Sequence, residues 1–176
     1  MKKIIAFIIL LAFAACNSHT LTNDSSPATK TDSSKAEVLY PYPIGYSSKF
    51  EFADPENSKM VLDLWKSYDN NTLDNVKDHF ADTVEMIFPG FRMRAGRDSI
   101  IATAKTGRNM SNSVISTVDV VMSVKSTDKG GNWVLVWGNE MRTDKKNNTD
   151  TVAIHEVWGL NKDGKIEFMQ QYASKK

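Results

Sequence analysis

The sequence predicts an α+β domain in which about three N-terminal helices pack on one face of a curved antiparallel sheet. Two observations predict this fold class. Apolar residues recur at helical spacing between residues 55 and 104, and from residue 114 onward they alternate with a period of two. Short turn sequences separate the later segments, as in hairpins. A group of helices followed by hairpin-linked strands is typical of α+β proteins.

The first helix is predicted to begin at Asp54-Pro55. An aspartate side chain can cap a helix, and proline is tolerated at the first helical position because its missing N–H costs nothing there. The helix is expected to end at Asn70-Asn71. Its apolar stripe comprises Met60, Val61, Leu64, Trp65 and Tyr68.

Two shorter helices are expected to follow, with Thr72 capping one and Asp98 capping the other. Their apolar residues are Leu73, Val76 and Phe80 in the first, and Ile100, Ile101 and Ala104 in the second. Between them, residues 84–88 and 91–94 are expected to form a short strand pair around the turn Pro89-Gly90.

Four antiparallel strands are predicted from residue 114 onward, linked by short polar or glycine-containing turns. The first is expected to place alternate residues on one face. Those residues are Val114, Ser116, Val118, Val120, Met122 and Val124. The other three strands are expected over residues 133–143, 151–160 and 166–173.

The N-terminus has the pattern of a secretory signal peptide over residues 1–15. Two lysines follow the initiator methionine, and an apolar run ends at Cys16. The run is too short to cross a bilayer as a helix, and small residues precede the cysteine. Ala14-Ala15-Cys16 resembles the lipobox of bacterial lipoproteins, which implies lipidation of Cys16. The alternatives are an ordinary secretory signal with an incidental cysteine and an uncleaved anchor.

A flexible tether and arm are predicted over residues 16–48, ahead of a globular domain over residues 49–176. The tether is rich in polar residues and cannot form a core. Residues 40–46 are expected to form an extended arm packed on the domain, or else a free proline-rich ligand. Because Asn17 follows the cysteine, the lipoprotein resemblance implies a lipid-anchored protein of the cell envelope, at the outer membrane of a Gram-negative bacterium.

Composition excludes several function classes. Acidic and basic residues nearly cancel, leaving a formal net charge of +1 and no strong field to attract nucleic acid. Cys16 is the only cysteine, so the domain lacks disulfides, thiolate metal sites and a cysteine nucleophile. The histidines and carboxylates lack metal-ligand spacing, and there is no glycine-rich phosphate loop. We therefore expect no metal, no cofactor and no nucleic-acid partner.

Five short motifs lie in the order and spacing of a known superfamily. They are Tyr68-Asp69-Asn70-Asn71-Thr72-Leu73-Asp74, His79-Phe80-Ala81-Asp82-Thr83-Val84, Phe88-Pro89-Gly90, Gly96-Arg97-Asp98-Ser99-Ile100, and His155-Glu156-Val157-Trp158 with Asp163-Gly164-Lys165-Ile166. Together they resemble the NTF2-like superfamily, in its SnoaL-like branch, over roughly residues 50–173. The resemblance implies a cone, in which a bent sheet wraps around helices and leaves an apolar pocket at the open end. It also implies a homodimer formed through the sheet.

Members of this superfamily include ketosteroid isomerases, polyketide cyclases, dehydratases, epoxide hydrolases and non-catalytic modules, so the fold alone does not assign a reaction. In isomerase-like members the catalytic base lies at the position of Phe88, and a catalytic tyrosine lies at the position of Leu64. Neither residue can transfer a proton. Glu156 falls on the acid that donates to the oxyanion, which makes it the one candidate for catalysis.

Glu156 has more than one interpretation from sequence. If it faces an apolar pocket, burial should raise its pKa and make it a hydrogen-bond donor or a general acid/base. Alternatively it pairs with Arg142 across the sheet or meets solvent at an edge. His155 precedes it in a strand, so the two side chains should point to opposite faces.

The same alternation predicts a largely apolar pocket lining. The expected residues are Trp65, Met86, Phe88, Trp137, Asn139, Glu156, Trp158, Met169 and Gln171. Such a lining would suit a small apolar molecule, although the aromatic residues could equally fill the cone as core. We expect a module that binds a small apolar molecule or a protein partner without catalysis. The alternatives are an isomerase-, dehydratase- or cyclase-type enzyme using Glu156, and a purely structural dimeric module.

Overall fold

The computed structural model describes residues 38–175, and a compact unit begins at Tyr40. The predicted signal peptide, the lipidation of Cys16 and most of the tether lie outside the described residues. Within residues 38–175, no helix is long and apolar enough to cross a membrane. The residues of the hydrophobic core all lie between Val61 and Met169, so the compact unit carries its own core.

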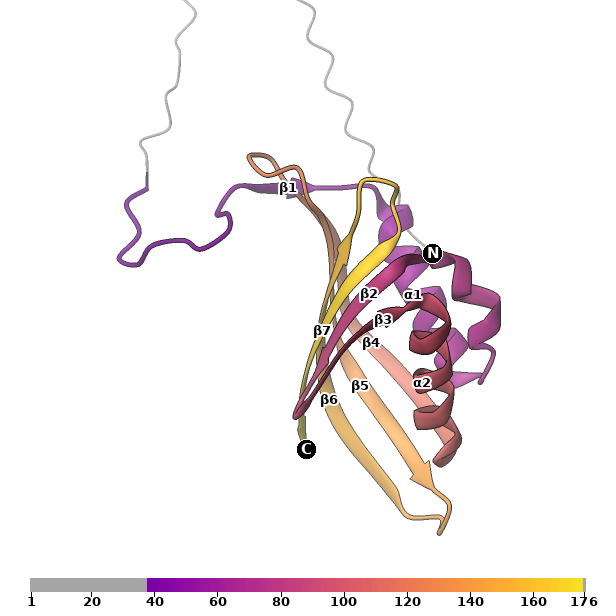
Figure 1. Ribbon diagram of the computed structural model, residues 1–176. Coiled ribbons are helices and arrows are strands. Elements are labelled where there is room, and N and C mark those ends of the chain that lie inside the picture. The colour runs from indigo at the N-terminus through magenta and orange to yellow at the C-terminus, as the bar shows by residue number, and fades with distance from the viewer. Residues whose placement is uncertain (1–37, 176) are drawn as a thin grey trace, which may run out of the picture. The chain divides into compact units, whose positions relative to one another are not determined.

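One mixed sheet of seven strands forms the body of the domain, and it curves around the helices (Figure 1). The strands are β1 (Phe50–Phe52), β2 (Phe80–Phe88), β3 (Phe91–Gly96), β4 (Ser111–Ser126), β5 (Asn132–Asp144), β6 (Thr149–Leu160) and β7 (Ile166–Lys175). Their order is β1-β4-β5-β6-β7-β2-β3. All neighbouring pairs are antiparallel except β2 and β7, which are parallel. The predicted α+β architecture with a curved sheet is confirmed, but the sheet is mixed and not wholly antiparallel as predicted, because β2 lies parallel to β7.

Three helical segments cover the concave face: α1 (Pro55–Asp69), the 3₁₀ helix η1 (Leu73–His79) and α2 (Arg97–Asn109). The predicted start of α1 is confirmed, since the Asp54 carboxylate accepts a hydrogen bond from the Glu56 amide at 2.9 Å. Thr72 is the N-cap residue of η1, as predicted, but its side chain makes no capping hydrogen bond. The predicted cap of the third helix is wrong, since Gly96, and not Asp98, is the N-cap of α2. Asp98 lies in the first turn of α2, where its negative charge interacts favourably with the positive end of the helix dipole.

The predicted inner face of β4 is wrong beyond its middle. A β-bulge interrupts the pairing with β5 between Val118 and Val120, and an extra residue there moves the alternation by one position. Val120, opposite Trp137, is consequently on the outer face and 40% exposed, whereas Val121, opposite Val136, packs against the core. Periodicity cannot reveal such a bulge, because the side-chain types on both sides of it are similar.

Candidate functional site

A cavity of about 370 Å³ lies between the concave face of the sheet and the helices. Its lining is largely apolar and comes from both helices, η1 and most strands. The apolar and aromatic lining residues are Leu64, Trp65, Tyr68, Leu73, Phe80, Met86, Phe88, Phe91, Met93, Ile100, Ile101, Ala104, Ile154, Trp158 and Met169, with Gly107 among them. The polar ones are Thr103, Ser116, Glu140, Arg142, Glu156 and Gln171.

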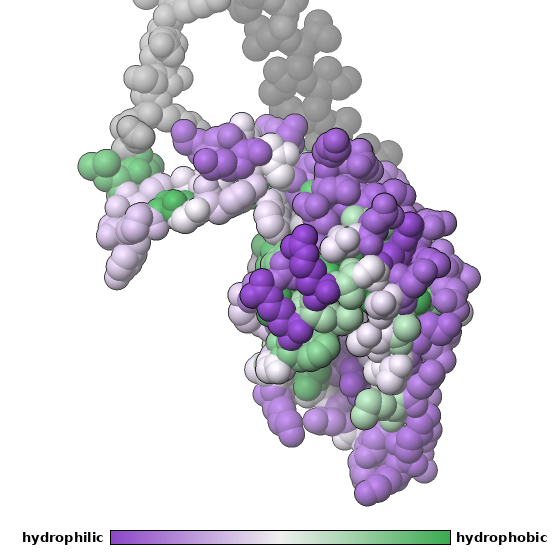
Figure 2. Space-filling model, in the orientation of Figure 1, coloured by the Kyte–Doolittle hydropathy of each residue, from purple (hydrophilic) through white to green (hydrophobic). Residues whose placement is uncertain are grey.

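The cavity reaches the surface of the domain. Phe91, which lines it and stacks on Phe88 with ring centroids 6.1 Å apart, is 50% exposed. Figure 2 shows hydrophobic residues gathered in the middle of the visible face, with hydrophilic residues around them. Part of the cavity lining is therefore accessible from solvent.

Glu156 on β6 is the most deeply buried charged residue of the cavity, with 5% exposure. Its Oε2 accepts hydrogen bonds from the indole N–H groups of Trp65, at 2.6 Å, and Trp158, at 3.0 Å. Its Oε1 accepts one from the Gln171 amide at 2.8 Å. Trp158 is two residues along the same strand and Gln171 is directly opposite on β7, so strand pairing places both beside the carboxyl group.

Burial raises the pKa of Glu156 to about 7. The three hydrogen bonds from Gln171, Trp65 and Trp158 act in the opposite direction, because they stabilise the carboxylate, and the negative charge of Glu140 adds to the increase. Near neutral pH the group therefore exists in both forms. When protonated it can donate a hydrogen bond to a bound molecule, and when ionised it can accept one.

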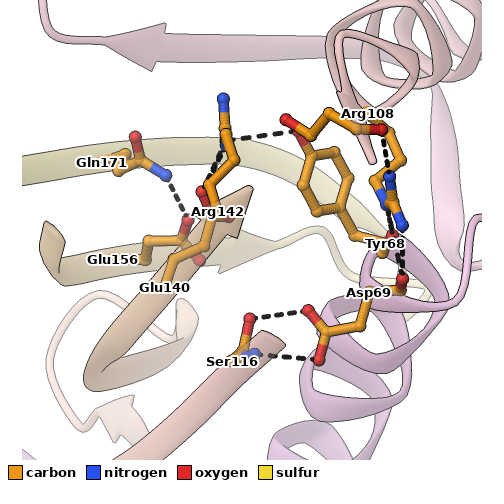
Figure 3. A network of polar contacts seen from close by, with 9 residues as sticks. Tyr68, Asp69, Arg108, Ser116, Glu140, Arg142, Glu156 and Gln171 are labelled. Atoms are coloured by element: carbon orange, nitrogen blue, oxygen red, sulfur yellow. Dashed lines mark hydrogen bonds and ion pairs between the residues drawn. The ribbon is translucent and has the colours of Figure 1, made fainter. Parts of the chain in front are cut away.

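The interpretation that Glu156 pairs with Arg142 is wrong, since Arg142 binds Glu140 instead (Figure 3). The guanidinium donates from Nε at 3.0 Å and from Nη2 at 2.5 Å to the same Glu140 oxygen. Nη2 also lies 3.5 Å from the Tyr68 hydroxyl. We call these three residues the Tyr68–Glu140–Arg142 cluster. Burial would lower the pKa of Arg142, but the Glu140 charge raises it, so the guanidinium stays charged.

A second set of contacts holds the end of α1 against β4 and so positions Tyr68 (Figure 3). The Asp69 carboxylate accepts hydrogen bonds from the Ser116 hydroxyl, at 2.8 Å, and from the Ser116 amide, at 3.1 Å. Arg108 on α2 donates to the Tyr68 carbonyl at 2.9 Å and to the Asp69 carbonyl at 3.0 Å. The Tyr68 carbonyl also accepts from the Asn71 amide at 3.1 Å. Arg108 therefore matters most for the Asp69 carbonyl, which lies at the end of the helix where intrahelical donors run out.

Most of the predicted lining residues do meet in the cavity. Those that line it are Trp65, Met86, Phe88, Glu156, Trp158, Met169 and Gln171. The prediction that Trp137 and Asn139 line the cavity is wrong. Val136, not Trp137, lies opposite Glu156, so Trp137 and Asn139 face the other side of β5. A displacement of one residue moves a strand's whole side-chain set to the opposite face.

Sequence reasoning missed Glu140 as a cavity residue for the same reason. The buried positions of β5 are Val134, Val136, Gly138 and Glu140. Gly138 is the one feature of the sequence that could have indicated which residues of β5 face inward. In the structure a Cβ at this position would lie 2.1 Å from a carbonyl oxygen of β4 and 3.2 Å from the Trp65 ring. A glycine inside a strand often marks such a close approach.

His155 points to the opposite face from Glu156, as predicted. On that outer face its ring lies between Trp137 and Tyr172, with centroid separations of 4.8 and 6.1 Å. These residues border an open groove of about 400 Å³. Among residues 38–175 there is no group of three His, Cys, Asp or Glu that could hold a metal ion.

No protein-family model matches the chain, and no curated protein matches its sequence. Solved structures do resemble it. An NTF2-like protein of unknown function from Exiguobacterium sp. 255-15 superposes with a TM-score of 0.54 and 12% identity, over 66% of this chain and 99% of the other. A SnoaL-like protein from Jannaschia sp. CCS1 has a TM-score of 0.56 and 16% identity to the present chain, over 70% of this chain and 91% of its own. The chain has an NTF2-like fold.

The NTF2-like fold is also that of an LEH-like epoxide hydrolase from M. tuberculosis. This enzyme has a TM-score of 0.54 and 17% identity to the present chain, over 68% of this chain and 83% of its own. Proteins with this fold thus include enzymes as well as proteins of unknown function. At such identities the likeness concerns the fold alone.

Proposed function

We propose that the cavity binds a small, largely apolar molecule and that Glu156 forms a hydrogen bond to a polar group of that molecule. One observation carries the proposal: a buried carboxyl group, held by three N–H donors, lines an apolar cavity that reaches the surface. The cavity volume of about 370 Å³ lies within the usual range for small-molecule sites. An apolar cavity with one or two fixed polar groups is the usual design of such sites.

Binding can be tested by calorimetric titration of residues 40–176 with 2-naphthol, whose hydroxyl group could pair with Glu156. Ala104 lines the cavity, so Ala104→Trp should fill it and abolish binding. Ala153 lies in the groove on the outer face, which makes Ala153→Trp the matched control that leaves binding unchanged. Equal loss of binding in both variants, or retention in both, would contradict the proposal.

A second candidate function is general acid/base catalysis by Glu156 in an isomerase-, dehydratase- or cyclase-type reaction. The observation that favours it is the pKa of about 7, because proton transfer is most efficient when the pKa is near the working pH. Phe88, at the family's base position, cannot assist. Turnover of a carbonyl or epoxide substrate panel that disappears in Glu156→Gln would support catalysis, whereas unchanged turnover in that variant would exclude Glu156.

We also propose a dimer through the outer face of the sheet. Several large apolar side chains are exposed on the outer face of β4, β5 and β7: Ile115, Val120, Met141 and Tyr172. Pairing two copies would remove them from water. Sedimentation should give twice the monomer mass for residues 40–176, and Val120→Asp should give the monomer. A monomeric parent protein at high concentration would contradict this proposal.

For cell location, we propose lipid attachment at Cys16 in the envelope of a Gram-negative bacterium. The support is the short apolar run that ends at this cysteine. Metabolic labelling with a fatty acid should mark the parent chain and not Cys16→Ser. Label in both proteins would refute attachment at this residue.

A further inference from the structure

The Tyr68–Glu140–Arg142 cluster lines the same cavity as Glu156. None of its three residues forms a hydrogen bond to Glu156. Its members come from α1 and β5. Glu140 and Arg142 are two residues apart on β5, so their side chains project from the same face of the strand. Figure 3 shows the guanidinium between the Glu140 carboxylate and the Tyr68 hydroxyl.

The cluster has little attraction for an anion. Two N–H groups of Arg142 bind Glu140 Oε1, at 3.0 and 2.5 Å, so the two opposite charges already compensate each other. An added carboxylate beside Arg142 would also lie close to the Glu140 carboxylate. Repulsion between like charges is strong at a partly buried site, because water screens it less there.

Hydrogen-bond donors, in contrast, are left over in the cluster. A guanidinium has five N–H groups, and within residues 38–175 Nη1 of Arg142 makes no hydrogen bond. Burial raises the pKa of the Tyr68 hydroxyl, so it keeps its proton at neutral pH, and no acceptor for that proton occurs among the described residues. The Arg142 side chain is 44% exposed and that of Glu140 only 10%, so the accessible groups are mainly donors.

The cluster and Glu156 lie at different places along the cavity. Val136 is the residue of β5 opposite Glu156, and Glu140 follows it by four positions, which corresponds to about 13 Å along a strand. The Glu140 charge nevertheless contributes to the raised pKa of Glu156. A single elongated molecule could therefore extend from one polar group to the other.

We propose that the bound molecule is a neutral carbonyl compound whose oxygen accepts hydrogen bonds from Arg142 Nη1 and the Tyr68 hydroxyl. Its apolar body extends along the cavity toward Glu156. A carbonyl oxygen has two lone pairs and no charge, which matches two free donors beside a compensated ion pair. This inference rests on the proposed function, since it names the class of molecule that the same cavity takes.

Three naphthalenes of similar size test the inference by calorimetric titration of residues 40–176. They are 2-acetylnaphthalene, which is a neutral ketone, 2-ethylnaphthalene, which has no oxygen, and 2-naphthoate, which is an anion. We expect the ketone to bind at least about tenfold more tightly than the hydrocarbon, as one hydrogen bond from a phenol and one from a charged guanidinium would allow. The naphthoate should bind no more tightly than the hydrocarbon.

Two variants then identify the donors. Tyr68→Phe should weaken binding of the ketone about fivefold and leave the affinity for the hydrocarbon unchanged. Arg142→Lys preserves a cation for Glu140 but removes Nη1, so it should act in the same selective way. Tyr172→Phe, which removes a phenol from the outer face, is the matched control and should change neither affinity.

The outcomes separate the two proposals. If none of the three compounds binds, both the small-molecule function and the carbonyl inference fail. If the hydrocarbon binds as tightly as the ketone, the cavity binds apolar molecules but the carbonyl inference is overturned. Tightest binding of the naphthoate also overturns it in favour of an anionic ligand, as do variants that weaken ketone and hydrocarbon equally.

Discussion

Ionisation of Glu156 should destabilise the folded domain as the pH rises toward 7. The pKa of this carboxyl group is about 7 in the folded protein, against 4.5 for the reference side chain. Between these two values the folded state binds more protons than the unfolded state, so the free energy of unfolding falls as the pH increases. Below pH 4.5 the contribution is fully present, and above pH 7 it is lost.

The size of the effect follows from the difference between the two pKa values. Each pKa unit corresponds to 1.36 kcal/mol, so a difference of about 2.5 units amounts to about 3 kcal/mol. This is a large share of the stability of a small domain. The variant Glu156→Gln cannot ionise, and its amide can still accept from the two indole N–H groups while Gln171 turns its carbonyl toward the new NH₂.

Urea unfolding of parent and Glu156→Gln domains at several pH values between 4.5 and 8 measures the effect. The variant should gain about 3 kcal/mol relative to the parent across this interval, because the other carboxyl groups titrate equally in both proteins. Glu167→Gln, at an exposed position on β7, is the control and should show no such trend. A stability difference between Glu156→Gln and the parent that stays constant with pH would refute a desolvated acid at this position.

Three further substitutions test the packing that positions the cavity. Gly138→Ala should destabilise the domain by about 1–3 kcal/mol or more and lower its melting temperature, because the new Cβ would lie 2.1 Å from a carbonyl oxygen of β4. Gly45→Ala is the control and should leave the melting temperature unchanged, because a Cβ at that position meets nothing within 4 Å. Arg142→Met leaves the Glu140 carboxylate without its partner and should lower the free energy of unfolding, measured in urea, by about 1–3 kcal/mol. The double variant with Glu140→Gln should recover most of that loss, and no recovery would contradict the pairing. Asp54→Ala removes the cap of α1 and should lower stability by about 1 kcal/mol, while an unchanged urea midpoint would argue against the cap.

Local sequence patterns were sufficient for most of the secondary structure. The capping aspartate and the proline after it locate the start of α1, and alternation locates β5, β6 and β7 to within a few residues. These signals are local, since they depend on backbone geometry and on which face of one element is apolar. The bulge at Val118 and Val120 and the parallel pairing of β2 with β7 depend on contacts between distant segments, so no local pattern reports them.

By itself the sequence determined the fold class, the candidate acid Glu156 and the placement of His155 on the opposite face of the strand from Glu156. The sequence also placed Trp65, Trp158 and Gln171 in the same lining, but only the tertiary structure decided that all three donate hydrogen bonds to Glu156. The pairing of β5 with β6 likewise determined that Glu140, and not Asn139, faces the cavity. Burial and charge at a point depend on the distances to every packed element, and those distances exist only once the register of the strands is set.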